Sequence, residues 1–314
     1  MARVAVQLTN FTGGELSPRL DGRNDLQKYA TGCKTLENMI IFPHGSAARR
    51  SGTQFVAEVK DSTKETRLIP FEFSTTQTYI LEFGNQYIRF FKDNGQILSS
   101  GSPYEISSPY LEAELFDIKF AQSADVMYIC HPNHPAKKLS RTGHTSWSLT
   151  SVDFTDGPYM DENISSTTIS TSAHTVGTGR TLTASSTTGI NDNTGFQTTD
   201  VGRLIRFRDG YGKITARTST TVVTIEILED MGSSSASANW SLGAFSETTG
   251  HPSCVTFFEQ RLVFAATLSQ PQTIFFSKSG DYENMDENRG GTIADDDAII
   301  YTIASNQVNA IRFM

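Results

Sequence analysis

The sequence predicts a mainly β protein whose body is of the β-propeller type, built from repeated antiparallel hairpins. Short segments with alternating apolar and polar residues, the pattern of strands with one buried face, follow one another along much of the chain. Turn residues separate them. A longer pattern recurs at residues 116–141 and 252–278: a strand, a short loop, an apolar strand, a loop containing proline and another strand. Repeats of this kind build propeller blades.

Composition and charge are those of a globular protein with an acidic body. The 314 residues allow two domains, or one large β domain with an insertion. The net charge of −8 argues against general affinity for nucleic acid across the surface. The charge is uneven, since residues 1–60 carry eight Lys/Arg and five Asp/Glu, whereas residues 61–314 carry 18 and 29.

The three cysteines, Cys33, Cys130 and Cys254, are odd in number and far apart, so they indicate neither a disulfide framework nor a zinc site. The first ten residues lack the apolar stretch of a signal peptide. No apolar run approaches the roughly 20 residues of a membrane-spanning helix. We therefore expect a protein that is made and folded in a cytoplasm and has no membrane span.

Residues 1–60 are expected to form an assembly arm with one short helix and a hairpin. Asp25 is a suitable N-cap for a helix over residues 26–38. The apolar stripe of this helix comprises Leu26, Tyr29, Ala30 and Cys33. The stripe makes Cys33 a buried residue rather than a reactive thiol. The hairpin is predicted from strands at residues 39–42 and 53–59 and a turn at residues 43–45.

An arginine pair, Arg49 and Arg50, lies beside this hairpin. Guanidinium groups bind both phosphates and carboxylates, so the pair could contact DNA or carboxylates of a neighbouring subunit. We favour the carboxylates, because the body of the chain is acidic. The residues assigned to subunit assembly are therefore Leu26, Tyr29, Cys33, Arg49 and Arg50.

Residues 61–155 and 247–314 are expected to form the propeller blades. The first blade is predicted from strands at residues 67–73, 78–83 and 87–91. The two later units match at residues 126–130 and 262–266, and at Pro135 and Pro271. A fourth unit is expected to start with residues 299–303 and 307–313, and the blades to continue beyond Met314.

Residues 156–246 are expected to form a small β-barrel or sandwich inserted between blades. The segment is rich in Ser, Thr and Gly, like a linker, but alternating stretches within it predict strands. These strands are residues 203–208, 213–217 and 222–227. Trp240 provides an apolar anchor. Three arginines beside two aspartates are expected to form a surface ion-pair cluster: Arg203, Arg206, Arg208, Asp200 and Asp209.

The sequence lacks a clear catalytic, cofactor or metal signature, and we predict none of these sites. His131 and His134 could bind a metal, but their loop is rich in proline and no third ligand is apparent. Residues 295–297 could hold a cation, but they lack the spacing of a calcium loop. Two carboxylates within residues 281–287 could form a glycosidase pair, although carboxylates are common in turns.

The chain resembles the tail nozzle proteins of short-tailed bacteriophages, also called tail tubular protein B. The resemblance rests on sequence blocks that follow one another along nearly all of the chain. These are residues 10–25 (NFTGGELSPRLDGRND), Lys28-Tyr29 with Gly32 and Asn38, and residues 49–56, 200–208 (DVGRLIRFR), 240–250 (WSLGAFSETTG), 251–264 and 271–284 (PQTIFFSKSGDYEN). The chain departs from the family pattern at Gly45-Ser46 and at Ser51, where members often have Gly-Gly and Arg-Arg-Pro-Gly.

The resemblance implies a non-enzymatic structural protein of the virion tail, in the nozzle through which DNA is ejected into the host. It implies a homohexameric ring below the portal and adaptor proteins, assembled in the cytoplasm of the bacterial host. Double-stranded DNA would pass without sequence-specific binding, because an acidic lumen repels it. The Ser/Thr-rich insert would face tail fibres or a host-surface receptor.

Two other functions stay open at this point. A carbohydrate-active or carbohydrate-binding propeller would use the acidic loop at residues 281–287 on glycans of the host surface. An adhesin would bind a host receptor through residues 156–246, and this role is compatible with a place in the nozzle.

Overall fold

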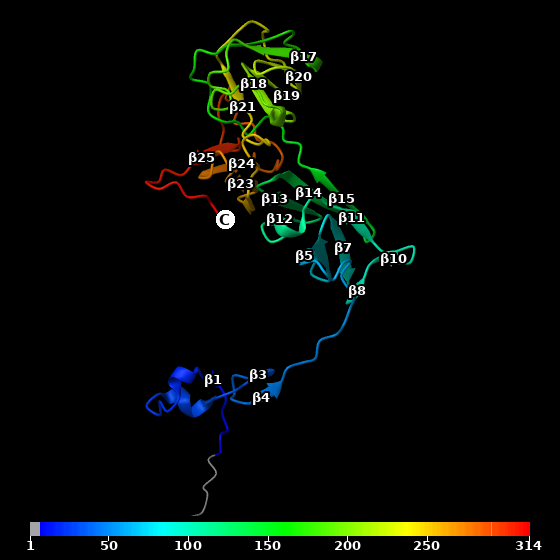
Figure 1. Ribbon diagram of the computed structural model, residues 1–314, viewed down its shortest axis with the longest axis vertical. Coiled ribbons are helices and arrows are strands. Elements are labelled where there is room, and N and C mark those ends of the chain that lie inside the picture. Colours follow the sequence, from blue (N-terminus) through cyan, green and yellow to red (C-terminus); the bar gives the residue numbers. More distant parts are fainter. Residues whose placement is uncertain (1–6, 290) are drawn as a thin grey trace, which may run out of the picture. The chain divides into compact units, whose positions relative to one another are not determined.

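The computed structural model describes residues 7–289 and 291–314 and is mainly β, as the sequence predicts (Figure 1). Strands make up 41% of the chain, and the described residues contain no helix of seven residues or more. None of the described helices is long and apolar enough to cross a membrane. The chain divides into two compact units, Met1–Val56 and Ala57–Met314. We call them the N-terminal unit and the body.

The N-terminal unit consists of short elements held together by backbone hydrogen bonds. Its elements are β1 (Gly14–Glu15), η1 (Pro18–Leu20), η2 (Gln27–Thr31), β2 (Gly32–Cys33), β3 (Met39–Ile41) and β4 (Ala47–Arg49). β1 and β2 pair in parallel, and β3 and β4 form an antiparallel hairpin. Glycine at residue 32 leaves room for the Leu16 side chain, whose Cγ atom would lie 2.5 Å from a Cβ atom at this position.

The prediction of a helix over residues 26–38 is wrong. Only a single turn of 3-10 helix, η2, forms, and the chain then extends into β2. Gly32 is a poor helix residue, and in the extended form its backbone pairs with Gly14. Asp25 does not cap the helix, because its carboxylate accepts two hydrogen bonds from the Arg23 guanidinium, at 2.7 and 2.6 Å.

The hairpin of the N-terminal unit is confirmed in its first strand and turn and wrong in its second strand. β3 turns at residues 43–45 and returns at once as β4, with Ile40 opposite Ala48. The predicted strand at residues 53–59 does not form. The turn is tight enough to pair the two strands directly, which leaves residues 53–59 without a partner strand.

The body contains three antiparallel sheets and a fourth, curled sheet. The strands of the first sheet are β5 (Arg67–Ser74), β6 (Gln77–Gly84), β7 (Tyr87–Lys92), β8 (Gly95–Gln96) and β11 (Glu105–Ser107). Those of the second are β12 (Lys119–Ser123), β13 (Val126–His131), β14 (His134–Gly143) and β15 (Ser146–Ser151). Those of the third are β22 (Cys254–Phe258), β23 (Arg261–Ala265), β24 (Thr273–Phe276) and β25 (Ile299–Thr302). The strands expected at residues 67–73, 78–83 and 87–91 are confirmed as β5, β6 and β7.

Short elements connect the first two sheets. They are the ribbon of β9 (Leu98–Ser99) and β10 (Ser102–Pro103), and the 3-10 turn η3 (Glu112–Glu114). In the second and third sheets the four strands are hydrogen-bonded in the order in which they occur in the chain. β13 and β23, which contain most of the matching residues 126–130 and 262–266, are each the second strand of such a sheet.

The second strand of the second sheet, β13, is buried on both of its faces. On one face Met127, Ile129 and Leu139 join the core of the first sheet. On the other face Tyr128 and Cys130 pack with residues of the third sheet. Successive residues of β13 thus alternate between two hydrophobic cores, as strand geometry requires.

The first strands of the three sheets lie along one side of this arrangement. β12 neighbours β22. The side chain of Gln122 in β12 accepts a hydrogen bond from the Glu72 backbone N–H in β5 at 3.1 Å and donates one to the Glu72 carbonyl at 2.9 Å. This amide replaces the direct backbone pairing that the two edge strands lack.

The expectation of a fourth unit starting at residues 299–303 and 307–313 is wrong. Ile299–Thr302 is the last strand of the third sheet, β25, and its Ile300 lies opposite Phe275 of β24. Residues 307–313 form no strand. The alternating pattern at residues 299–303 correctly indicates a strand, but this strand pairs with β24, about 25 residues earlier in the chain.

The inserted segment forms a curled six-stranded sheet, the half-barrel, in place of the expected barrel or sandwich. Its strands are β16 (Ile169–Thr171), β17 (Gly177–Ala184), β18 (Leu204–Phe207), β19 (Gly210–Arg217), β20 (Val222–Ile227) and β21 (Trp240–Leu242), and η4 (Thr198–Asp200) precedes β18. They lie in the order β16-β17-β20-β19-β18-β21. The three predicted strands are confirmed as β18, β19 and β20, and Trp240 lies in the core as predicted. A bridge between Ile169 and Ser237 links the two edges of the sheet.

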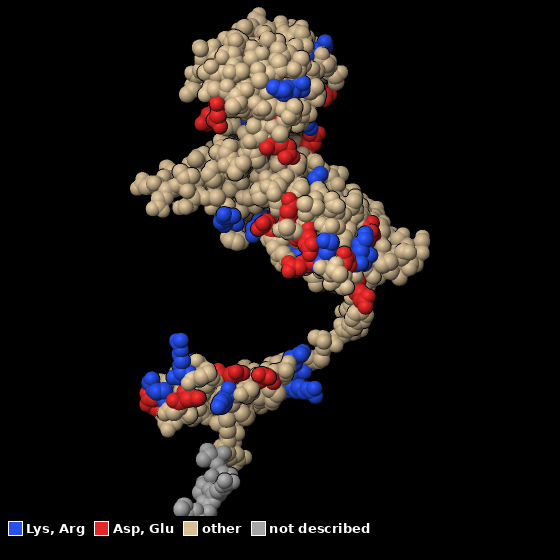
Figure 2. Space-filling model, viewed as in Figure 1, with Lys and Arg blue, Asp and Glu red and all other residues tan. Residues whose placement is uncertain are grey.

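The face of the half-barrel that is visible in Figure 2 carries few charged side chains. Between Asn163 and Thr199 the sequence has only two charged residues, Arg180 and Asp192. The sequence of this segment is rich in Ser, Thr and Asn, and its few charges contrast with the mixed charges on the remainder of the body (Figure 2).

Arg203 and Asp200 form a buried ion pair, which corrects the prediction that they belong to a surface cluster. Both side chains are fully buried, and the Arg203 Nη1 atom donates to the Asp200 Oδ1 atom at 2.8 Å. Arg203 also donates through Nε to the Gly243 carbonyl at 2.7 Å, and through Nη1 to Asn191. Asp200 accepts from the Gln197 backbone N–H and from Asn191. The pair therefore fixes η4 against the segment that leaves the half-barrel.

We predict that Arg203→Ala destabilises the half-barrel by about 3–5 kcal/mol, because it leaves Asp200 buried without its counter-charge. The matched control is Lys213→Ala, which removes the exposed Lys213–Asp153 pair from the same sheet and should cost less than about 1 kcal/mol. Urea unfolding followed by Trp240 fluorescence, in a Trp147→Phe background, measures both. Equal effects of the two substitutions would contradict the prediction.

Candidate functional site

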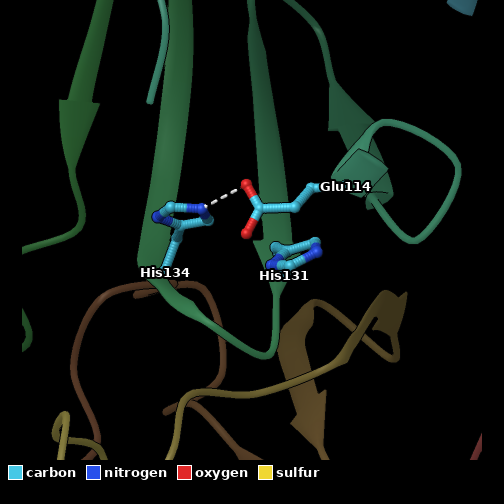
Figure 3. Close-up of side chains that lie close together, drawn as sticks. All are labelled: Glu114, His131 and His134. Atoms are coloured by element: carbon cyan, nitrogen blue, oxygen red, sulfur yellow. Dashed lines mark hydrogen bonds and ion pairs between the residues drawn. The ribbon is translucent and has the colours of Figure 1, made fainter. Parts of the chain in front are cut away.

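Three side chains of the body that can bind metals or protons point toward one another (Figure 3). They are Glu114, His131 and His134, and the candidate ligand atoms all lie within 4.8 Å of one another. We call this group the Glu–His cluster. Glu114 is the last residue of η3, His131 ends β13 and His134 begins β14.

The hairpin between β13 and β14 brings the two histidines together. They face each other across the ladder, with Pro132 and Asn133 in the turn, and their ring centroids are 5.2 Å apart. The sequence indicates the two histidines as a possible metal-binding pair but gives no sign of a third ligand. Glu114 lies in the connection between two sheets, 20 residues before His134, and local spacing carries no signal for such a contact.

The Glu114 carboxylate is held in place by three donors. Its Oε2 atom accepts from the Leu111 backbone N–H at 2.9 Å and lies 2.8 Å from His134 Nε2, and its Oε1 atom accepts from Asn133 at 3.3 Å. Burial alone would raise the pKa of this carboxyl group, but these hydrogen bonds lower its pKa to about 2. The carboxylate is therefore ionised, and His134 Nε2–H is the donor.

His131 is almost fully buried, with 2% of its surface exposed. Its Nδ1 atom accepts the Asn133 backbone N–H at 3.2 Å, whereas its Nε2 atom has no hydrogen-bond partner among the described residues. Burial lowers the pKa of this ring, so its neutral form is favoured.

Tyr110 adds a second unpartnered polar atom beside the Glu–His cluster. Its ring lies 5.3 Å from that of His134 and 6.1 Å from that of His131, and it is fully buried. Its hydroxyl has no partner in the part of the chain that the structure describes. Burial raises the pKa of this hydroxyl, which keeps it protonated. Buried polar atoms without partners are rare, so two of them here call for an explanation.

Several of the other acidic candidates are engaged in ion pairs. Glu283 lies in the acidic loop at residues 281–287. Its carboxylate accepts hydrogen bonds from Lys138 Nζ at 2.6 and 2.8 Å. Glu287 pairs with Arg289 in the same loop. Asp297 contacts Lys278 Nζ at 3.2 Å and accepts the Ala294 N–H. These carboxylates neutralise neighbouring cations within the body.

The residues assigned to assembly all lie in the N-terminal unit, but the structure does not join the first three into a helical stripe. Leu26, Tyr29 and Cys33 are half-buried, and the Cys33 thiol lies 3.7 Å from the Gly14 carbonyl oxygen. Cys33 is thus not the buried residue that the stripe predicted, because the helix that would have covered it does not form.

The two arginines assigned to assembly differ in their contacts. Arg50 donates through Nε to the Asn38 side chain at 2.7 Å, so it closes the base of the β3–β4 hairpin. Arg49 is exposed, and its side chain makes no hydrogen bond or ion pair among the described residues. Of the pair, Arg49 is therefore the residue whose charge is available to another surface.

No protein-family model matches this chain, and no curated protein matches it. Functional inference therefore rests on its own residues. The described part of the chain offers two features for it: the N-terminal unit with its exposed charges and apolar side chains, and the Glu–His cluster in the body.

We predict that Glu114→Gln destabilises the body by about 1.5–3 kcal/mol at pH 7, because it removes a charge-assisted hydrogen bond with His134. The pKa of Glu114 is lower in the folded state, so its stabilisation is complete above its ordinary pKa of 4.5 and is lost as the pH falls toward 2. The difference between wild type and variant should shrink over that range.

Urea unfolding between pH 7 and pH 3, followed by Trp147 fluorescence, checks this expectation. The control is Asp117→Asn, an exposed carboxyl group three residues away whose side chain forms no hydrogen bond among the described residues. A loss of stability that does not depend on pH would show that Glu114 acts through packing alone.

Proposed function

We propose that the chain is a structural subunit of a virus particle, a tail nozzle protein that assembles as a ring around a path for DNA. The observation that carries this proposal is the N-terminal unit, which folds without a hydrophobic core. The arrangement of the sheets in the body, the charge distribution and the sequence resemblance support it further.

The N-terminal unit buries none of its apolar side chains within itself. Among residues 7–56 the only buried positions are Gly32 and Gly45. Its exposed large apolar side chains are Leu8, Met39, Ile40, Phe42, Phe55 and Val56. A segment of about 50 residues with so little burial cannot offset the conformational entropy that it loses on folding. It gains the missing burial by docking on its own body or on a neighbouring subunit, as an assembly arm does.

The body has the features of a rigid wall. Its three sheets pack face to face, with the first strands along one side, and this stacking supports a propeller-type wall in which four-stranded sheets serve as blades. We therefore keep the propeller as the architecture of the ring wall. Residues 61–314 carry 29 acidic and 18 basic side chains, a balance that favours sliding of DNA over binding of it.

The half-barrel suits an outward position in this proposal. Its few charges and its Ser/Thr-rich surface offer hydroxyl and amide groups for contacts with tail fibres or a host-surface receptor. The partners of the ring itself would be further copies of the chain, in a hexamer, and the adaptor proteins next to the portal. The nozzle would lie in the virion tail after assembly in the bacterial cytoplasm.

We predict that Arg49→Ala with Arg50→Ala lowers ring assembly at least tenfold while the subunit stays folded. Arg49→Ala alone should account for most of the loss, because Arg50 is already bonded to Asn38. Sedimentation velocity and negative-stain electron microscopy measure assembly, and circular dichroism measures folding.

The control for this experiment is Arg19→Ala with Lys34→Ala, which removes two exposed positive charges from the same unit. The control should assemble normally. Normal rings from the Arg49/Arg50 variant would remove the arm from the proposal. Labelling of the half-barrel in particles tests the location, and label found only on a capsid shell would overturn it.

Binding of a glycan is a second candidate function, and a groove in the body favours it. The groove has a volume of about 640 Å³ and lies between the half-barrel and the loops of the third sheet. Amide, hydroxyl and carboxylate groups line it, and the nearly buried Trp240 forms part of its wall. Such groups suit sugar hydroxyls.

In the case of glycan binding, Asp192→Ala should weaken binding of a host-surface polysaccharide at least tenfold. Asp192 is exposed and lines the groove. Asp209→Ala, an exposed carboxylate elsewhere on the half-barrel, is the control and should bind normally. Biolayer interferometry with purified polysaccharides makes the comparison, and no binding by the wild type would end this candidate.

A further inference from the structure

We propose that the Glu–His cluster is a binding site for one divalent transition-metal ion, with Zn²⁺ as the best match. The site would be structural and would connect η3 to the β13–β14 hairpin. This inference does not depend on the proposed role in a tail nozzle, because all three ligands come from one chain.

The ligand set matches zinc chemistry. Two imidazoles and one carboxylate are ligands that Zn²⁺ prefers, whereas Mg²⁺ and Ca²⁺ prefer sites made of oxygen alone. In a tetrahedral zinc site with bonds of about 2.1 Å, the ligand atoms lie roughly 3.4 Å from one another. The ligand atoms of Glu114, His131 and His134 are within 4.8 Å of one another. Side-chain rotations alone can bring them to this spacing.

The buried atoms without partners are the second observation that points to a ligand. His131 is 98% buried, its ring is part of the cluster, and its Nε2 atom has no partner among the described residues. The Tyr110 hydroxyl beside the two imidazoles also has no hydrogen-bond partner among the described residues. A metal ion coordinated by His131, with a water molecule that hydrogen-bonds to Tyr110, would satisfy both groups.

Coordination would replace two contacts of the metal-free form. The ion would take the place of the proton between His134 Nε2 and Glu114 Oε2, which are 2.8 Å apart. Coordination through His131 Nε2 would move the proton of the neutral ring to Nδ1, so the 3.2 Å contact with the Asn133 N–H would be given up. Both changes are confined to the hairpin turn and η3.

The site is accessible to an ion from one side. The side chains of His134 and Glu114 remain 21% and 16% exposed, whereas His131 and Tyr110 form the buried side. The exposed side leaves room for entry of the ion and for water as a fourth ligand. Its position suits a structural role, because the hairpin turn also accepts a hydrogen bond at Pro132 O from the His251 N–H, which leads into the third sheet. An ion here would fix the turn between the first and third sheets.

The test uses the full chain, treated with a chelator and then titrated with Zn²⁺ in a calorimeter. We expect one equivalent to bind and the melting temperature to rise. His131→Ala and His134→Ala should each weaken Zn²⁺ binding at least tenfold. Glu114→Gln should weaken Zn²⁺ binding as well. His144→Ala is the control, since His144 bonds to Tyr79 elsewhere in the body and should leave the affinity unchanged.

Replacing Zn²⁺ with Co²⁺ distinguishes metal binding at the Glu–His cluster from metal binding at a cysteine. The proposal predicts visible d–d absorption without a thiolate charge-transfer band, and loss of this spectrum in His131→Ala. A variant that fails to fold is replaced by His131→Gln, which keeps the size of the side chain. Absence of stoichiometric binding, a thiolate band, or equal affinities for the wild type and both histidine variants would each overturn the proposal.

Discussion

The fold of the body depends on the burial of β13, the second strand of the second sheet, on both of its faces. Because β13 sends alternate side chains into two different cores, neither neighbouring sheet can be removed without exposing apolar surface. The other features follow from this constraint. The edge strands β5 and β12 are linked by the amide of Gln122. The half-barrel leaves from the end of the second sheet and has to return the chain to the start of the third.

The same constraint explains why many strands of the body could be predicted from the sequence. A strand with one or two buried faces needs apolar side chains at fixed positions, and β5 shows the alternating period while β6 and β7 show longer apolar runs. Partners distant in the sequence could not be predicted in this way. The pattern at residues 299–303 was visible, but only the structure shows that it pairs with β24. Burial of Arg203 also depends on groups far away, among them the Gly243 carbonyl.

In the N-terminal unit, where no core fixes the positions of apolar residues, the sequence pattern predicted the wrong secondary structure. Apolar residues at helical spacing predicted a helix there, yet among residues 7–56 only Gly32 and Gly45 are buried, so the unit itself has no core for such a stripe to cover. Without that burial, the poor helix propensity of Gly32 and its pairing with Gly14 decide the local structure. The third member of the Glu–His cluster escaped prediction for a related reason, since Glu114 reaches the histidines only through the path of η3 between two sheets.

The position of the half-barrel in the chain also affects the order of folding. Roughly 100 residues separate the end of β15 from the start of β22. At a synthesis rate of about 5–20 residues per second, the ribosome needs about 5–20 seconds to cover this distance. During that interval the face of the second sheet with Tyr128 and Cys130 has no partner. Newly made chains therefore pass through an intermediate with an exposed apolar sheet face, which is prone to aggregation. Several ribosomes on one messenger RNA would bring the exposed faces of neighbouring nascent chains together.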